Sequence, residues 1–150
     1  MKRIVLILAL VAAPATAREV GQVGVDWVGN DIVIEAIADP KVQGVTCHLA
    51  YFERSVLDRL SQGNWFEDPS YSAIDCTATG PITLGDIDPE GEQVFSERQS
   101  LILKSLRVTR LYDPQAHALV YLAHASEITQ GSGKMSLSVV PLGPDVAPPR

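Results

Sequence analysis

The sequence has only two cysteines, Cys47 and Cys76, and only three histidines. It contains no C-x-x-C pair and no H-x-x-x-H pair, so the spacings typical of zinc sites are missing. Basic residues are also few, with 12 against 18 acidic residues and a formal net charge of −6. Such an acidic chain lacks the positive surface that binds nucleic acids or anionic membranes. We therefore expect no nucleic acid or membrane partner, no metal and no cofactor.

Long apolar runs are confined to the N-terminus. Two basic residues precede the ten apolar residues 4–13, and Ala15 and Ala17 supply the small side chains that signal peptidase accepts. Ten residues are too few for a membrane-spanning helix, which needs about 20. The pattern predicts that residues 1–17 form a signal peptide, that cleavage follows Ala17, and that the exported product has no membrane span.

The rest of the chain has the size and composition of one folded domain. Removing 17 of the 150 residues leaves 133, close to the usual domain length. The content of 46% hydrophobic and 20% charged residues is typical of a globular protein. We expect a single β-rich domain over residues 18–141. The proline-rich tail, residues 142–150, is expected to be extended or disordered.

Runs of β-branched and aromatic residues predict a mainly antiparallel β structure, either a sandwich or an open barrel. Gly29 and Asn30 are suited to a tight hairpin turn between the first two strands. A capping pattern and the spacing of leucines predict one short helix over 55–63. The glycines and prolines of 79–92 indicate a loop or short edge segments. The expected strands are 20–28, 31–39, 45–52, 73–78, 99–113, 118–126 and 134–142.

The two cysteines admit three interpretations: a disulfide, a reactive thiol with His48 as its base, or a metal site. Cys47 and His48 are neighbours in a predicted strand, so their side chains point to opposite faces and cannot converge on one atom. In an exported protein two cysteines pair and stay paired, and only one connectivity exists. We therefore predict a Cys47–Cys76 disulfide.

An acidic segment resembles a calcium-binding loop of the EF-hand type. Positions 1, 3, 5, 6 and 12 of such a loop are occupied by Asp86, Asp88, Glu90, Gly91 and Glu97. Three features do not fit: proline at position 4, glutamate at position 5, and no amphipathic helix before the loop. The alternative is a solvated acidic loop.

Basic residues cluster at Arg98, Lys104, Arg107 and Arg110. On a strand, Lys104 and Arg110 share a face with apolar neighbours, where an unpaired cation is costly. Two hypotheses follow. Either carboxylates pair with these cations, or the cations mark a pocket for a small anionic ligand.

Histidine and aromatic residues supply further candidates. His124 is expected to be buried and neutral, and His117 to be exposed at a turn. Trp65 and Phe66 lie in a polar segment, where they either form an exposed contact patch or fold back over the end of the sheet. The segment 131–136 lacks the features of a phosphate-binding loop.

Four segments, in their order along the chain, carry a resemblance to a known family. They cover nearly the whole mature chain and include the surroundings of both cysteines: "DPKVQGVTC" (39–47), "IDCTATGPI" (74–82), "VFSERQSLILKSLRVTRLYD" (94–113) and "ALVYLAHASEITQGSGKMSLSVVP" (118–141). The sequence resembles the CreA family of small exported proteins of Gram-negative bacteria. The resemblance implies a periplasmic location and supports the disulfide, but it implies no biochemical activity.

No catalytic motif is recognisable in the sequence. Our leading hypothesis is a non-enzymatic module that binds an envelope protein or a small anionic ligand. The first alternative is a hydrolase-type enzyme with a site assembled from distant residues, for which His117, Asp113 and Glu97 are candidates. The second is a structural protein stabilised by calcium.

Overall fold

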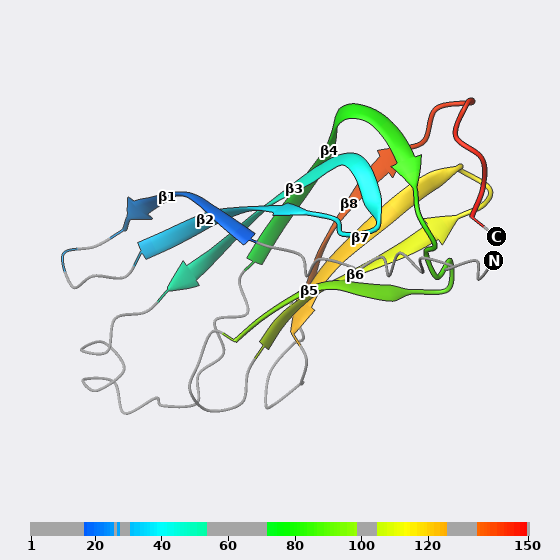
Figure 1. Ribbon diagram of the computed structural model, residues 1–150. Helices are drawn as coiled ribbons and strands as arrows, with labels where there is room; N and C mark the ends of the chain where they lie inside the picture. Colours follow the sequence, from blue (N-terminus) through cyan, green and yellow to red (C-terminus); the bar gives the residue numbers. More distant parts are fainter. Residues whose placement is uncertain are drawn as a thin grey trace, which may run out of the picture.

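The computed structural model describes residues 17–25, 27, 31–53, 72–98, 105–125 and 135–149 (Figure 1). Within these ranges every regular element is a β-strand. The strands are β1 (Ala17–Gly24), β2 (Asp31–Ala38), β3 (Val42–Glu53), β4 (Ser72–Leu84), β5 (Glu92–Arg98), β6 (Ser105–Asp113), β7 (Ala118–Ala125) and β8 (Met135–Pro141).

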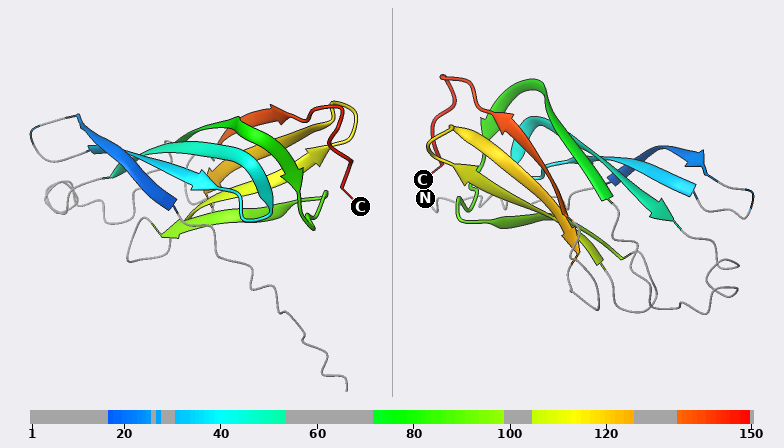
Figure 2. Two further views of the ribbon diagram at one scale, coloured as in Figure 1. Left: turned by 45° about the horizontal axis from the view of Figure 1, so that its top comes forward. Right: turned by 180° about the vertical axis from the view of Figure 1, so that it is seen from behind.

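The strands form two four-stranded antiparallel sheets, in the orders β1-β2-β3-β4 and β5-β6-β7-β8. β4 and β8, the last strands of the two sheets, lie side by side, and the β1–β2 hairpin lies at the end of the molecule far from the β6–β7 turn (Figures 1 and 2). The prediction of a mainly β, antiparallel fold is confirmed. The short helix predicted over 55–63 falls outside the described residues, and the described part contains no helix.

The core lies between the sheets and follows the two-residue period of the strands. In β3, Cys47, Leu49 and Tyr51 are buried while the alternate residues face outward. In the opposite sheet, Leu119 and Tyr121 of β7 are fully buried. Residues from both sheets belong to one hydrophobic cluster, so the sheets stabilise each other through a shared interior.

The segment 79–92, predicted as a loop or short edge segments, contains the end of β4, which pairs with β3 across a bulge. β4 continues to Leu84, so residues 79–84 are strand and only 85–91 connect it to β5. The register shifts between Gln43 and Val45, where Gly44 has a φ of +80°. A Cβ atom at Gly44 would lie 2.3 Å from the carbonyl oxygen of Pro81. Glycine is therefore required here, and the bulge accommodates a proline within a strand.

The C-terminal tail also differs from its prediction. Leu142 is buried, and its amide donates a hydrogen bond to the carbonyl oxygen of His117 at 2.9 Å. The amide of Val146 donates to the carbonyl of Gly143, which makes a turn, and Val146 packs against the core. The tail is held by the β6–β7 turn because apolar side chains lie between its prolines.

Candidate functional site

Arg110 is the centre of a buried ionic network. Its side chain is 1% exposed and faces inward from β6, on the same face as Leu106 and Val108. Nη1 donates to both carboxylate oxygens of Asp39 at 2.6 Å, and Nη2 donates to Glu92 at 2.5 Å. The two carboxylates come from different sheets, since Asp39 follows β2 and Glu92 begins β5.

Asp39 receives hydrogen bonds from several parts of the chain. Its Oδ1 accepts from the amides of Lys41 and Val42, which fixes the turn into β3. Its Oδ2 accepts from the hydroxyl of Tyr121 at 3.0 Å. Burial, together with the neighbouring charge of Asp39 and this hydrogen bond, raises the pKa of Tyr121 well above 10.0. Asp39 therefore joins the first sheet to β6 and β7 of the second.

Lys41 completes the network through an ion pair with Glu92, so two cations face two carboxylates. Of the two hypotheses for the basic residues, pairing with carboxylates describes Arg110, and this side chain is not open to an anionic ligand. Arg107 faces outward and is exposed, as its strand position predicts. The side chains of Arg98 and Lys104 fall outside the described residues.

Acid should weaken this network. Partial burial alone would raise the pKa of Glu92. The hydrogen bonds from Lys41 and the Asp88 amide, with the charges of Arg110 and Lys41, outweigh burial and lower this pKa below its ordinary value of 4.5. The stabilisation by ionised Glu92 is therefore present above about pH 4.5 and is lost as the pH falls through the lower, folded-state pKa.

We expect Glu92→Gln to lower the free energy of unfolding by about 0.5–1 kcal/mol at pH 7, and to flatten its decline between about pH 5 and pH 3. Urea unfolding at a series of pH values measures both effects. Glu90→Gln, at an exposed position in the preceding turn, is the matched control and should follow the wild-type pH profile. If the Glu92 variant and the wild type lose stability equally in acid, ionised Glu92 does not stabilise the network.

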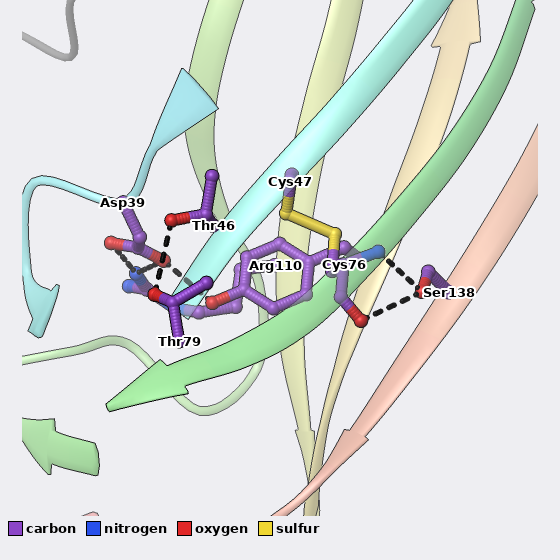
Figure 3. The surroundings of a disulfide bond; sticks show 8 residues. Asp39, Thr46, Cys47, Cys76, Thr79, Arg110 and Ser138 are labelled. Carbon is purple, nitrogen blue, oxygen red and sulfur yellow. Dashed lines mark hydrogen bonds and ion pairs between the residues drawn. A yellow bond between two sulfur atoms is a disulfide. The ribbon is translucent and has the colours of Figure 1, made fainter. Parts of the chain in front are cut away.

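Cys47 and Cys76 are joined in a disulfide between β3 and β4 (Figure 3). The two residues are directly opposite in the strand register, with Cα atoms 3.9 Å apart, and both are buried. A Cα separation this short is typical of a cross-strand pair whose two residues do not hydrogen-bond to each other through their backbones. The N–H and C=O of Cys76 therefore point away from β3, toward β8. The bond lies in the core and closes the chain segment between the two strands.

Ser138 of β8 satisfies these backbone groups at the seam between the sheets (Figure 3). The amide of Cys76 donates to Ser138 Oγ at 2.8 Å, and the hydroxyl donates back to the Cys76 carbonyl at 3.5 Å. Ser138 is itself buried. One side chain therefore takes the place of a backbone hydrogen bond between two strands of different sheets.

We expect Ser138→Ala to lower the free energy of unfolding by about 1–3 kcal/mol, because it leaves the buried Cys76 amide without an acceptor. Ser136→Ala is the matched control on the same strand. The Ser136 hydroxyl is buried and has no hydrogen-bond partner among the described residues, so its removal should be neutral or slightly stabilising. Urea denaturation of the two variants gives the comparison, and equal effects would refute the role of Ser138.

The histidines are placed differently from their predictions. His117 is half-buried, with a φ of 49°. Its Nε2 lies 3.0 Å from the carbonyl oxygen of Val146, which can only accept, so Nε2 carries the proton. Nδ1 of the same ring is hydrogen-bonded to the hydroxyl of Tyr112, 2.9 Å away. His117 thus holds the C-terminal tail, and both of its nitrogens are engaged.

His124, predicted to be buried, is half-buried on the outer face, and its Nε2 lies 3.1 Å from the hydroxyl of Thr109. The prediction assigned the wrong face of β7 to the core, because both faces of this strand are rich in apolar residues. Asp113 accepts hydrogen bonds from the amides of Gln115 and Ala116 and so shapes the β6–β7 turn. The structure brings His117 and Asp113 to the same turn; the side chain of Glu97 lies outside the described part.

The acidic segment does not have the form of an EF-hand loop. Positions 7–12 of the proposed loop, residues 92–97, belong to strand β5. Asp88 accepts a hydrogen bond from the amide of Glu90 in a local turn. Among the described residues, no three acidic, histidine or cysteine side chains lie close enough together to hold a metal ion. Trp65 and Phe66 fall outside the described ranges.

Two exposed apolar regions were not identified from the sequence. The first is strand β1 and the residues after it, where Val20, Val23 and Val25 are 50–53% exposed and Trp27 is 97% exposed. The second is the outer face of β8, with Met135, Leu137 and Val139. The sequence signal was present: valines on both faces of β1 indicate that apolar residues cannot all point into one core. The described part of the chain contains no helix that could cross a membrane.

Comparison with known proteins extends the resemblance noted in the sequence. The model of the family described as CreA protein matches residues 20–145. The chain belongs to the CreA family. It is 40% identical over 154 residues to Protein CreA of Escherichia coli strain K12, covering 95% of this chain and 96% of the relative. The proteins of the same description from strains O6:H1 and O157:H7 give the same values. No solved structure gives a significant match.

The region matched by the CreA family model includes most of the features described above. The disulfide, the Asp39–Arg110 network and the Ser138 seam all lie between residues 20 and 145. So do the two exposed apolar regions. The names of the family and of these relatives state no activity or ligand.

Proposed function

We propose that this CreA-family chain is exported to the periplasm, where it acts as a non-enzymatic module that binds another envelope protein by strand addition at β1. The predicted signal peptide supports export. The disulfide supports an oxidising compartment, where such bonds persist.

The exposed edge of β1 carries the proposal. Among the described residues, β1 pairs with β2 on one side only. Residues 20–25 contain three valines and no charged residue or proline. The valines are about half exposed, and Trp27 beyond them is 97% exposed. An uncharged edge of this kind offers unpaired backbone groups and apolar contact area to an incoming strand.

The other strand edges are less suited to this role. β4 and β8 lie against each other and are linked through Ser138. β5 includes Glu92, Glu97 and Arg98, and charged side chains discourage pairing at an edge. Two features of β1 oppose pairing, namely the charged residues Arg18 and Glu19 and the bulge between Glu19 and Gly21. The bulge lies at the start of the strand, so the regular ladder from Gly21 to Gly24 remains available.

The chemistry of this edge defines its partner. An extended segment with uncharged, β-branched side chains would pair with β1 and pack beside Val23. The indole of Trp27 would add apolar area and one hydrogen-bond donor. A small anionic ligand is less well supported, because the buried cation Arg110 is already paired with two carboxylates.

Photo-crosslinking in the periplasm tests the proposal. A photoreactive residue at Val25 should give one discrete adduct with an envelope protein, and Val23→Lys should abolish it by placing a charge on the edge strand. Val139→Lys is the matched control, because Val139 is a valine of similar exposure on another strand. The proposal fails if Val25 gives no discrete adduct, or if Val23→Lys and Val139→Lys reduce the adduct equally.

A further inference from the structure

The outer face of β6, β7 and β8 is apolar in its middle. The inner face of these strands forms the core, so the alternate residues face away from it. Met135 and Leu137 are 67% and 61% exposed, and Val139 is 47% exposed. Cross-strand neighbours of these residues continue the surface. By register the outer face consists of Arg107, Thr109, Leu111, Asp113, Ala118, Val120, Leu122, His124, Met135, Leu137, Val139 and Pro141, of which Ala118 is buried.

The register arranges this outer face in four rows across the strands. Arg107, His124 and Met135 form the row at one end, and Asp113, Ala118 and Pro141 form the row at the other. The two rows between them contain five apolar residues and Thr109. β6 therefore carries a cation at one end of the face and a carboxylate at the opposite end, with apolar surface between them.

We propose that this outer face binds the same face of a second copy of the chain, in a symmetric dimer. A two-fold axis that lies along the face and crosses the strands exchanges the first row with the fourth and the second with the third. Arg107 of each copy then faces Asp113 of the other, and the apolar rows pack together. The interface gains two ion pairs from a single symmetry operation, and it covers the exposed side chains of β8.

The charges of Arg107 and Asp113 distinguish the axis that crosses the strands from an axis parallel to them. An axis parallel to the strands would leave each row opposite itself, so Arg107 would meet no carboxylate of the described face. His124 lies in the same row as Arg107 and is hydrogen-bonded to Thr109 of its own sheet. With the two-fold axis that crosses the strands, this row faces the row of the other copy that contains Asp113. Gln93 and Ser96, the residues of β5 that pair with Thr109 and Arg107, are uncharged residue types. Charge complementarity therefore selects the antiparallel arrangement of the two β6 strands.

The size of the face sets the expected strength. Three strands about 4.8 Å apart, over seven residues of about 3.4 Å each, form a patch of only a few hundred Å². Stable dimers bury about 800 Å² per partner. The dimer should therefore be reversible and depend on protein concentration. It also uses a surface separate from β1, so partner binding at β1 and self-association can occur in the same molecule.

Sedimentation equilibrium of the mature, oxidised protein tests the dimer. The wild type should pass from the mass of one chain to that of two as the concentration rises into the high micromolar range. Arg107→Glu places like charges opposite each other at both ends of the interface, and should weaken the dimer at least about tenfold. Leu137→Asp should abolish it. Val23→Lys should dimerise as the wild type does, whereas Val139→Lys should not.

A mixture of two charge variants gives the sharpest result. Arg107→Glu and Asp113→Lys each create two repulsive pairs in their own homodimers. Mixed in equal amounts, they restore two attractive pairs in the heterodimer, so the dimer fraction should return toward the wild-type value. Asp113 also supports the β6–β7 turn, so circular dichroism must show that the Asp113→Lys variant is folded. If that variant is unfolded, Asp113→Asn replaces it, because asparagine keeps the oxygen that accepts the hydrogen bonds of the turn. Asp113→Asn should then weaken the dimer. A wild type that stays monomeric, or folded charge variants whose mixture shows no recovery, would overturn the proposal.

Discussion

Replacing Asp39 by Asn should lower the free energy of unfolding by about 3–5 kcal/mol at neutral pH, because the change leaves the buried guanidinium of Arg110 without its principal counter-charge. Asn keeps an oxygen that can accept from the amides of Lys41 and Val42, so the turn into β3 is preserved and the loss reports the charge. Urea unfolding followed by circular dichroism measures this difference.

Two further variants make the interpretation specific. The double variant Asp39→Asn with Arg110→Met removes both charges, and should recover most of the lost stability, since a buried ion pair is often replaceable by apolar packing. Asp88→Asn is the same change at an exposed turn position and should alter stability by less than about 0.5 kcal/mol. An Asp39→Asn variant as stable as the Asp88→Asn variant would show that Arg110 does not depend on Asp39.

Removing the disulfide should produce the other large loss. The variant with both Cys47→Ala and Cys76→Ala should lose about 3–4 kcal/mol, as estimated for release of a loop of about 30 residues in the unfolded chain. The melting temperature should fall by roughly 10 °C. The buried position of both cysteines predicts, in addition, that the folded protein resists mild reductants.

Differential scanning calorimetry with and without reductant measures the loss. Fully reduced wild-type protein should melt close to the double alanine variant, because both lack the same crosslink. Changing both cysteines together avoids a free thiol, which could form mixed disulfides. If the double variant melts with the oxidised wild type, the crosslink does not contribute to stability.

The two largest effects concern residues that join parts of the chain rather than residues of a catalytic site. Asp39 and Arg110 connect the two sheets at one place, and Cys76 connects β3 to β4 and, through Ser138, to β8. These connections join the two sheets and leave the β1 edge and the outer face of β6–β8 exposed. A framework of this kind suits a binding module.

Seven of the eight described strands, the disulfide and the inward position of Arg110 follow from local patterns, whereas β5 was not predicted. Alternating apolar residues define strands, two cysteines in an exported chain allow one pairing, and parity along β6 places Arg110 beside Leu106 and Val108. The sequence also suggested that carboxylates neutralise this cation. It did not indicate which ones, because Asp39 and Glu92 are 71 and 18 residues away from Arg110.

What the sequence by itself determined is the β class, the cysteine pairing and the family, because each depends on residue type and short-range spacing. Tertiary structure alone decided the partners of Arg110, the acceptor of the Cys76 amide, the packing of the tail on His117 and the outward face of β7. These depend on which sheet covers which face of a strand. A strand such as β7, apolar on both sides, carries no local signal that distinguishes the core from the surface.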